Sequence, residues 1–163
     1  VALGMALQHP DRVRSCTLIA SAGLGAEIDA DYIEGVVEAD RRRQLKPYLE
    51  RLFADPSRVS RQLVDELLKF KRLDGVREAL GTLARNFVAD GKQVAVLRNE
   101  LEQLGPPAQV VWGDKDQIIP ASHAEGLPDR ICTELLADCG HMVQMEAAGE
   151  VNKIILSFLE KTD

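Results

Sequence analysis

The segment Gln109-Val-Val-Trp-Gly-Asp-Lys-Asp116-Gln-Ile-Ile-Pro120 joins a short apolar run to an acidic loop. The apolar run is rich in β-branched residues, follows a glycine-proline breaker and ends at a glycine, which predicts a buried strand. A second apolar run, residues 131–136, predicts another strand, and the loop behind it contains His141. If the two strands are parallel neighbours, both loops lie at the carboxyl edge of the sheet, where open α/β folds place their sites. We therefore expect Asp116 and His141 to meet.

An acid followed by a histidine is two thirds of a nucleophile-base-acid triad, in which the carboxylate orients the imidazole. The chain order acid then histidine is that of the α/β-hydrolases, where the serine comes first. Residues 112–120 resemble the acid loop of this superfamily, and residues 140–146 resemble its histidine loop. The family pattern falls on Asp116, so Asp114 is interpreted as a turn residue. The resemblance implies an α/β fold: the carboxyl-terminal portion of an α/β-hydrolase, with about three parallel strands, flanking helices and a helical cap insertion.

Each of these motifs also has a purely structural interpretation. A Gly-Asp-x-Asp loop is often a turn, since aspartate side chains accept hydrogen bonds from their own backbone, and a Gly-His pair is compatible with the start of a helix. A metal site built from Asp116, His123, His141 and Cys139 lacks the short ligand spacings of zinc sites, so we expect no metal. The order of the two motifs, each behind a strand, favours the triad.

Composition narrows the class of protein. A chain of 163 residues, 45% of them hydrophobic, can form one globular domain with a core. A formal charge of -6 argues against a nucleic-acid partner, which requires a basic face. No apolar run approaches the roughly 20 residues of a membrane span, so no membrane partner is expected. Three cysteines without a framework spacing predict reduced thiols in a cytoplasmic protein.

The chain divides into three parts by pattern and by resemblance. Residues 1–25 resemble the helix after a nucleophile elbow and the strand that follows it, predicted at 13–20. Residues 26–104 are mostly helical and resemble a cap. Residues 105–163 hold the two strands, their loops and a short helix over 121–126, on which His123 is expected to be exposed. They end in a helix over 143–161, with Glu146 in its first turn, where a negative charge favours the helix dipole. In the middle part, the apolar pattern predicts helices at 47–53, 60–73, 75–88 and 93–103, with Asp74 as the cap of the third. Tyr32, Phe53 and Phe70 are expected to line an acyl pocket.

The nucleophile is expected outside this chain, because no Gly-x-Ser-x-Gly occurs in it. The polypeptide by itself is therefore expected to lack triad activity, while its parent protein is expected to be an acyltransferase or hydrolase. The first strand is expected to expose an unpaired apolar edge. We therefore expect the chain either to self-associate through that edge or to be one piece of a longer molecule.

Segments 21–35, 45–47, 52–56 and 69–75 resemble the cap of the hydrolase-like domain in the acyltransferase component of acetoin dehydrogenase, a dihydrolipoyllysine-residue acetyltransferase. This resemblance implies acyl transfer from a small thioester, with a lipoyl group and coenzyme A as cofactors held outside this chain and other subunits of the complex as partners. Asp116 would orient His141, which would act as general base and then general acid. Two alternatives stay open: a stand-alone esterase, thioesterase or carbon-carbon-bond hydrolase, and a non-catalytic assembly domain.

Overall fold

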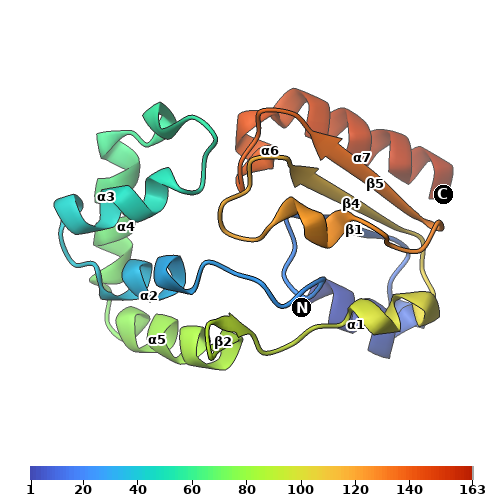
Figure 1. The fold of residues 1–163 in the computed structure, drawn as a ribbon, viewed down its shortest axis with the longest axis horizontal. Coiled ribbons are helices and arrows are strands. Elements are labelled where there is room, and N and C mark those ends of the chain that lie inside the picture. Colours follow the sequence, from blue (N-terminus) through green and yellow to red (C-terminus); the bar gives the residue numbers. More distant parts are fainter. Residues whose placement is uncertain (163) are drawn as a thin grey trace.

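A computed structural model describes residues 1–162 and contains a three-stranded parallel sheet in the order β1-β4-β5 (Figure 1). The strands are β1 (Cys16–Ile19), β4 (Ala108–Gly113) and β5 (Ile131–Leu136). All six residues of β4 are buried, because this strand pairs on both sides and is covered on both faces. The predicted α/β architecture with three parallel strands is confirmed. β1 is shorter than predicted: a 3₁₀ turn η1 (Pro10–Arg12) precedes it, its pairing with β4 begins only at Cys16, and Ala20 at its other end has a positive φ of 43°.

Two layers of helix sandwich the sheet. α1 (Ala2–Gln8) and η3 (Arg98–Gln103) cover one face, where Leu3 and Leu101 pack with Val110. α6 (Val143–Glu146) and α7 (Ala148–Thr162) cover the other face, where Val143 packs with Val111 (Figure 1). Successive residues of β4 thus enter opposite cores, as the two-residue period of a strand requires. The predicted single terminal helix is divided in two at Ala147.

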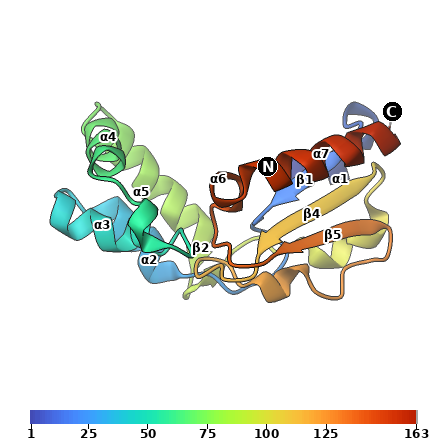
Figure 2. The same ribbon diagram turned by 90° about the horizontal axis from the view of Figure 1, so that it is seen from above.

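Four helices form a separate group beyond the carboxyl ends of the strands, which we call the helical lobe (residues 30–87) (Figure 2). They are α2 (Ala30–Glu38), α3 (Arg42–Glu50), α4 (Arg61–Lys71) and α5 (Val76–Phe87). The lobe has a core of its own, which includes Leu45, Leu49, Phe53, Val64 and Leu68. Its position beside the carboxyl edge of the sheet brings it next to the loops that follow β4 and β5.

The lobe differs from the sequence prediction at two helix boundaries. α3 begins at Arg42 and contains Pro47, whereas the sequence predicts a helix that starts at Pro47. The first residues of α3 are charged, so an apolar pattern does not reveal them. α5 is preceded by Gly75, which adopts a left-handed φ of 77°, and Asp74 is not its cap. The predicted start of α4 is confirmed, since the hydroxyl of its N-cap Ser60 accepts the Leu63 N–H at 3.1 Å.

The helix predicted over residues 93–103 is wrong in its first half. A hairpin formed by β2 (Val88–Ala89) and β3 (Lys92–Gln93) turns through Asp90 and Gly91, both with positive φ. The chain then leaves the hairpin without forming a helix, and the Leu97 N–H donates to the carbonyl of Gly23 at 2.7 Å. Only η3 is helical, because hydrogen bonds to a distant loop outweigh the weak local helix preference. Within residues 1–162, no helix combines the length and the apolar character that crossing a membrane requires.

Cysteine reactivity offers a direct test of the packing. Cys16 and Cys139 are buried, and burial raises the pKa of both thiols, whereas Cys132 is exposed on β5. Because the thiolate is the reactive form, iodoacetamide at about pH 8 is expected to modify Cys132 and to spare the other two. Mass spectrometry of tryptic peptides measures this, with denatured protein as the control in which all three cysteines react. Equal labelling of the three in the native protein would contradict the burial of Cys16 and Cys139.

Candidate active site

The structure brings Asp116 and His141 together. Nδ1 of His141 lies 2.9 Å from Oδ2 of Asp116. The aspartate follows β4 and the histidine follows β5, so the parallel neighbours β4 and β5 place both loops at one edge, as the sequence predicts. The Asp116 side chain is 0% exposed and that of His141 is 22% exposed. The imidazole therefore faces outward from a carboxylate that is shielded from water.

The Asp116 carboxylate is surrounded by hydrogen-bond donors. Oδ1 accepts the backbone N–H groups of Ile118 at 2.8 Å and Ile119 at 3.0 Å. Oδ2 accepts from His141 and also from the indole Nε1 of Trp112 at 3.0 Å. Four donors match an ionised carboxylate, which only accepts. A donating Nδ1–H on His141 leaves Nε2 of the neutral ring as an acceptor, and Nε2 has no hydrogen-bond partner within residues 1–162.

Trp112 is a member of this site that the sequence interpretation missed. Its indole is fully buried at the end of β4, and its N–H is shared between Asp116 and the carbonyl of Ile119, 3.1 Å away. A buried indole N–H requires an acceptor, and an aspartate four residues later was available to supply it. A position in a buried strand explains why the indole ring of Trp112 is apolar and buried. It does not indicate which group accepts the indole N–H.

Gly113 lets the acid and histidine loops approach each other closely. A Cβ on Gly113 would lie 2.3 Å from the carbonyl oxygen of Cys139, which is closer than real Cβ atoms approach. The Lys115 N–H donates to the same Cys139 carbonyl at 2.9 Å, which ties the loops by backbone. An exposed ion pair between Lys115 and Asp138 adds a second tie, raising the pKa of the lysine and lowering that of the aspartate. Asp114 is exposed in this turn.

His123 is buried, contrary to its predicted exposure. Its side chain is 5% exposed, and its Nε2 lies 2.8 Å from Oε2 of Glu27, which lowers the pKa of that glutamate. The short helix η4 (Ala121–Ala124) carries it inward, where its ring meets the ring of Trp112 edge to face at 6.3 Å. His123 is thus paired with Glu27, away from the Asp116–His141 contact. Residues 1–162 contain no group of three histidines, cysteines or acids arranged to hold a metal ion.

The three aromatic residues predicted to line an acyl pocket do not share one cavity. Tyr32 lines an apolar cavity of about 330 Å³ between α2 and α5, and burial raises the pKa of its hydroxyl to about 12. Phe53 belongs to the core of the helical lobe, and Phe70 is 49% exposed. The prediction is wrong for the latter two residues, because apolar helical spacing does not distinguish a core position from a pocket lining.

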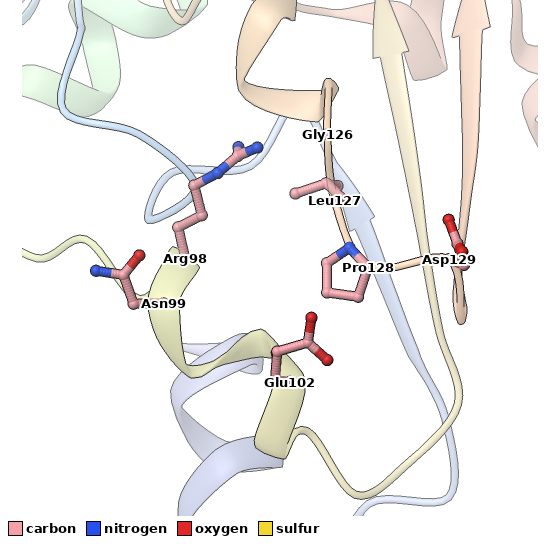
Figure 3. Close-up of a pocket in the computed structure, with 7 residues that line it drawn as sticks. All are labelled: Arg98, Asn99, Glu102, Gly126, Leu127, Pro128 and Asp129. Atoms are coloured by element: carbon pink, nitrogen blue, oxygen red, sulfur yellow. The ribbon is translucent and has the colours of Figure 1, made fainter.

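A more polar cavity of about 500 Å³ lies at the amino end of β5 (Figure 3). It is lined by Arg98, Asn99, Glu102, Gly126, Leu127, Pro128 and Asp129. The Arg98 guanidinium donates to the carbonyl of His123 at 2.9 Å and to that of Leu24 at 3.3 Å, so it ties the backbone of two loops together. This cavity contains neither residue of the Asp116–His141 pair.

Known proteins resemble this chain at several levels. The dihydrolipoyllysine-residue acetyltransferase component of the acetoin cleaving system of Pseudomonas putida is 51% identical over 161 residues, which are 99% of this chain and 43% of that protein. The corresponding component of Cupriavidus necator is 45% identical, over 98% of this chain and 42% of its own length. Human monoacylglycerol lipase ABHD6 is 26% identical over 94% of this chain and 50% of its own. The chain thus spans at most half the length of these relatives.

Solved structures share the fold. The meta-cleavage product hydrolase CumD of Pseudomonas fluorescens superposes with a TM-score of 0.85 at 20% identity, over 99% of this chain and 61% of that structure. The family described as alpha/beta hydrolase fold matches residues 1–148. Because this match covers most of the sequence, the chain belongs to the α/β-hydrolase fold family.

Proposed function

We propose that this chain supplies the acid and the base of a serine-dependent acyl transfer. The observation that carries the proposal is the hydrogen bond between the shielded Asp116 and the partly exposed His141, 2.9 Å long, at the carboxyl edge of the sheet. The nucleophile is a serine from outside residues 1–163, since no Gly-x-Ser-x-Gly occurs among them. The helical lobe, within residues 26–104, acts as the cap over this site.

The reaction follows from the geometry of the pair. Nε2 of His141 removes the proton of the serine hydroxyl as the oxygen attacks the acyl carbonyl, and the imidazolium then protonates the leaving group. Asp116 keeps the ring in the tautomer that presents Nε2 and stabilises the imidazolium without itself becoming protonated. Attack of an acceptor on the acyl-serine repeats these two proton transfers and regenerates the serine.

The substrate class rests on the relatives. The two bacterial acetyltransferase components favour acyl transfer between a lipoyl thioester and coenzyme A, with other subunits of a cytoplasmic acetoin-cleaving complex as partners. Both cofactors would be bound with the help of parts outside this chain. The second candidate is hydrolysis of small esters, thioesters or carbon-carbon bonds by a stand-alone enzyme, favoured by the 26% identity to a monoacylglycerol lipase. The unpaired edge of β1 is also part of the proposal: either a second copy pairs with it, or a further part of the native protein covers it. For residues 1–163 alone, a monodisperse monomer in light scattering would contradict self-association through this edge.

The test is labelling of the native protein that carries this chain with a serine-directed fluorophosphonate, followed by peptide mapping. We expect one labelled serine and acetyl transfer from S-acetyldihydrolipoamide to coenzyme A. If the protein is labelled but only hydrolyses esters, the second candidate, hydrolysis, is correct and acyl transfer is wrong. A native protein that stays unlabelled would contradict the catalytic role and leave a non-catalytic assembly domain derived from a hydrolase.

A further inference from the structure

Glu146 joins the helical lobe to the loop that carries His141. Its Oε2 accepts the backbone N–H of Gly140 at 2.6 Å, and its Oε1 accepts the backbone N–H of Ala54 at 2.9 Å. Gly140 immediately precedes His141, whereas Ala54 lies between α3 and the short 3₁₀ helix η2 (Pro56–Arg58) of the lobe. One carboxylate therefore spans two segments, and Ala54 is 92 residues from Glu146 in the sequence.

The residue on the other side of His141 is also held by the lobe. The Met142 N–H donates to the carbonyl of Leu52 at 3.0 Å. His141 thus lies between two backbone amides, one bound to Glu146 and the other to the lobe itself. A movement of the lobe segment 52–54 therefore also displaces His141, because both of its chain neighbours are attached to that segment.

Close backbone packing accompanies these hydrogen bonds. A Cβ on Gly140 would lie 2.7 Å from the nitrogen of Ala54 and 2.9 Å from the carbonyl oxygen of Leu52, so only glycine permits this approach. The Arg58 guanidinium adds two longer contacts at 3.4 Å, to the carbonyls of Met145 and Glu146 at the end of α6. The Glu146 carboxylate therefore accepts hydrogen bonds from two specific backbone N–H groups, those of Gly140 and Ala54. This role is more specific than the helix-dipole interaction predicted from the sequence.

We propose that Glu146 is a positioning residue for His141, through which the seating of the helical lobe on the sheet edge sets the orientation of the imidazole toward the nucleophile. This inference rests on the proposed function, because it assigns a consequence to the position of His141. It couples the orientation of the imidazole to the position of the helical lobe, which the Asp116–His141 hydrogen bond alone does not do. When the lobe shifts, the Nδ1–Asp116 hydrogen bond is strained from the His141 side, and Nε2 loses its alignment.

The variant Glu146→Gln separates this role from a general contribution to folding. Glutamine has the same shape but offers one oxygen, so it keeps one of the two amide contacts and sets its NH₂ group against the other N–H. Glu150→Gln is the matched control, since it removes the same charge from an exposed site in the first turn of α7. Circular dichroism verifies that both variants of the native protein remain folded. Glu146→Asp, one methylene shorter, is a second variant that cannot span both amides.

Three measurements test the coupling. Hydrogen exchange is expected to accelerate about tenfold in Glu146→Gln and Glu146→Asp at whichever of the Gly140 and Ala54 amides loses its acceptor. The ¹⁵N spectrum of the His141 imidazole is expected to show a shifted titration and a mixed tautomer, and the pH dependence of fluorophosphonate labelling is expected to move with it. Glu150→Gln is expected to match the unmodified protein in all three. Labelling is expected to slow about tenfold in Glu146→Gln.

Failure of this inference is distinguishable from failure of the proposed function. If the unmodified protein is not labelled at all, the proposed function fails, and the imidazole spectrum still decides whether Glu146 positions His141. Unchanged amide exchange and an unchanged imidazole spectrum in both Glu146 variants would overturn the inference, whatever the labelling shows. Faster exchange with an unaltered imidazole titration would also overturn it, because Glu146 would then only attach the lobe.

Discussion

Asp116→Asn is expected to lower the rate of fluorophosphonate labelling of the native protein by about 10³- to 10⁴-fold. All four hydrogen-bond partners of the carboxylate are donors, so an asparagine NH₂ would face either two backbone amides or the pair formed by His141 and Trp112. The histidine relieves this conflict by becoming an acceptor at Nδ1. Its proton then resides on Nε2, the atom that must accept the serine proton, and the base is lost.

The matched control is Asp114→Asn in the same loop. Asp114 is exposed, and its backbone N–H donates to the carbonyl of Leu136 at 3.0 Å, a bond that the substitution leaves in place. Labelling of this variant is expected to equal that of the unmodified protein. Rapid labelling of Asp116→Asn, or slow labelling of Asp114→Asn, would show that the acid had been assigned to the wrong residue. Labelling rates are measured from the time course of probe incorporation.

Gly113→Ala is expected to cause a large loss of stability for the addition of a single methyl group, roughly 3 kcal/mol or more in the free energy of unfolding. The new Cβ would lie 2.3 Å from the carbonyl oxygen of Cys139 and 2.4 Å from that of Gly140. Both obstacles are backbone, so relief requires the acid and histidine loops to separate. The measurement is the midpoint of urea unfolding, which is expected to fall strongly because domains of this size are stable by only about 5–15 kcal/mol.

Gly149→Ala tests whether the effect comes from the clash. Gly149 lies in α7, and a Cβ there has no atom within 4 Å. Alanine is the better helix former, so this variant is expected to gain up to about 1 kcal/mol of stability. An unfolding midpoint of Gly113→Ala that equals that of the unmodified protein would refute the close approach of the two loops. A loss of stability in both variants would point to a general effect of the extra methyl group.

The strands of the sheet and the central contact of the candidate site could be predicted from the sequence. Residues 109–112 and 131–136 are β-branched or apolar runs bounded by breakers, a local pattern with few alternatives inside a core. Parallel pairing then places the loops that follow them at one edge, and the structure has Asp116 and His141 in hydrogen-bond contact there. These features were predictable because a local pattern defines each strand and its loop, and the parallel pairing of neighbouring strands then brings the two loops together.

Features that depend on contacts between distant segments of the chain could not be predicted in this way. The sequence indicated that His123 is exposed, whereas the structure buries its side chain beside Glu27. It indicated that Glu146 interacts with the helix dipole, whereas the Glu146 carboxylate accepts a hydrogen bond from Ala54 of the helical lobe. Leu97 likewise leaves its predicted helix for a carbonyl of a distant loop. Such partners carry no local periodicity. They depend on the free energy of packing distant segments together. The hydrogen bonds formed there contribute more to stability than the conformational preference of a short segment.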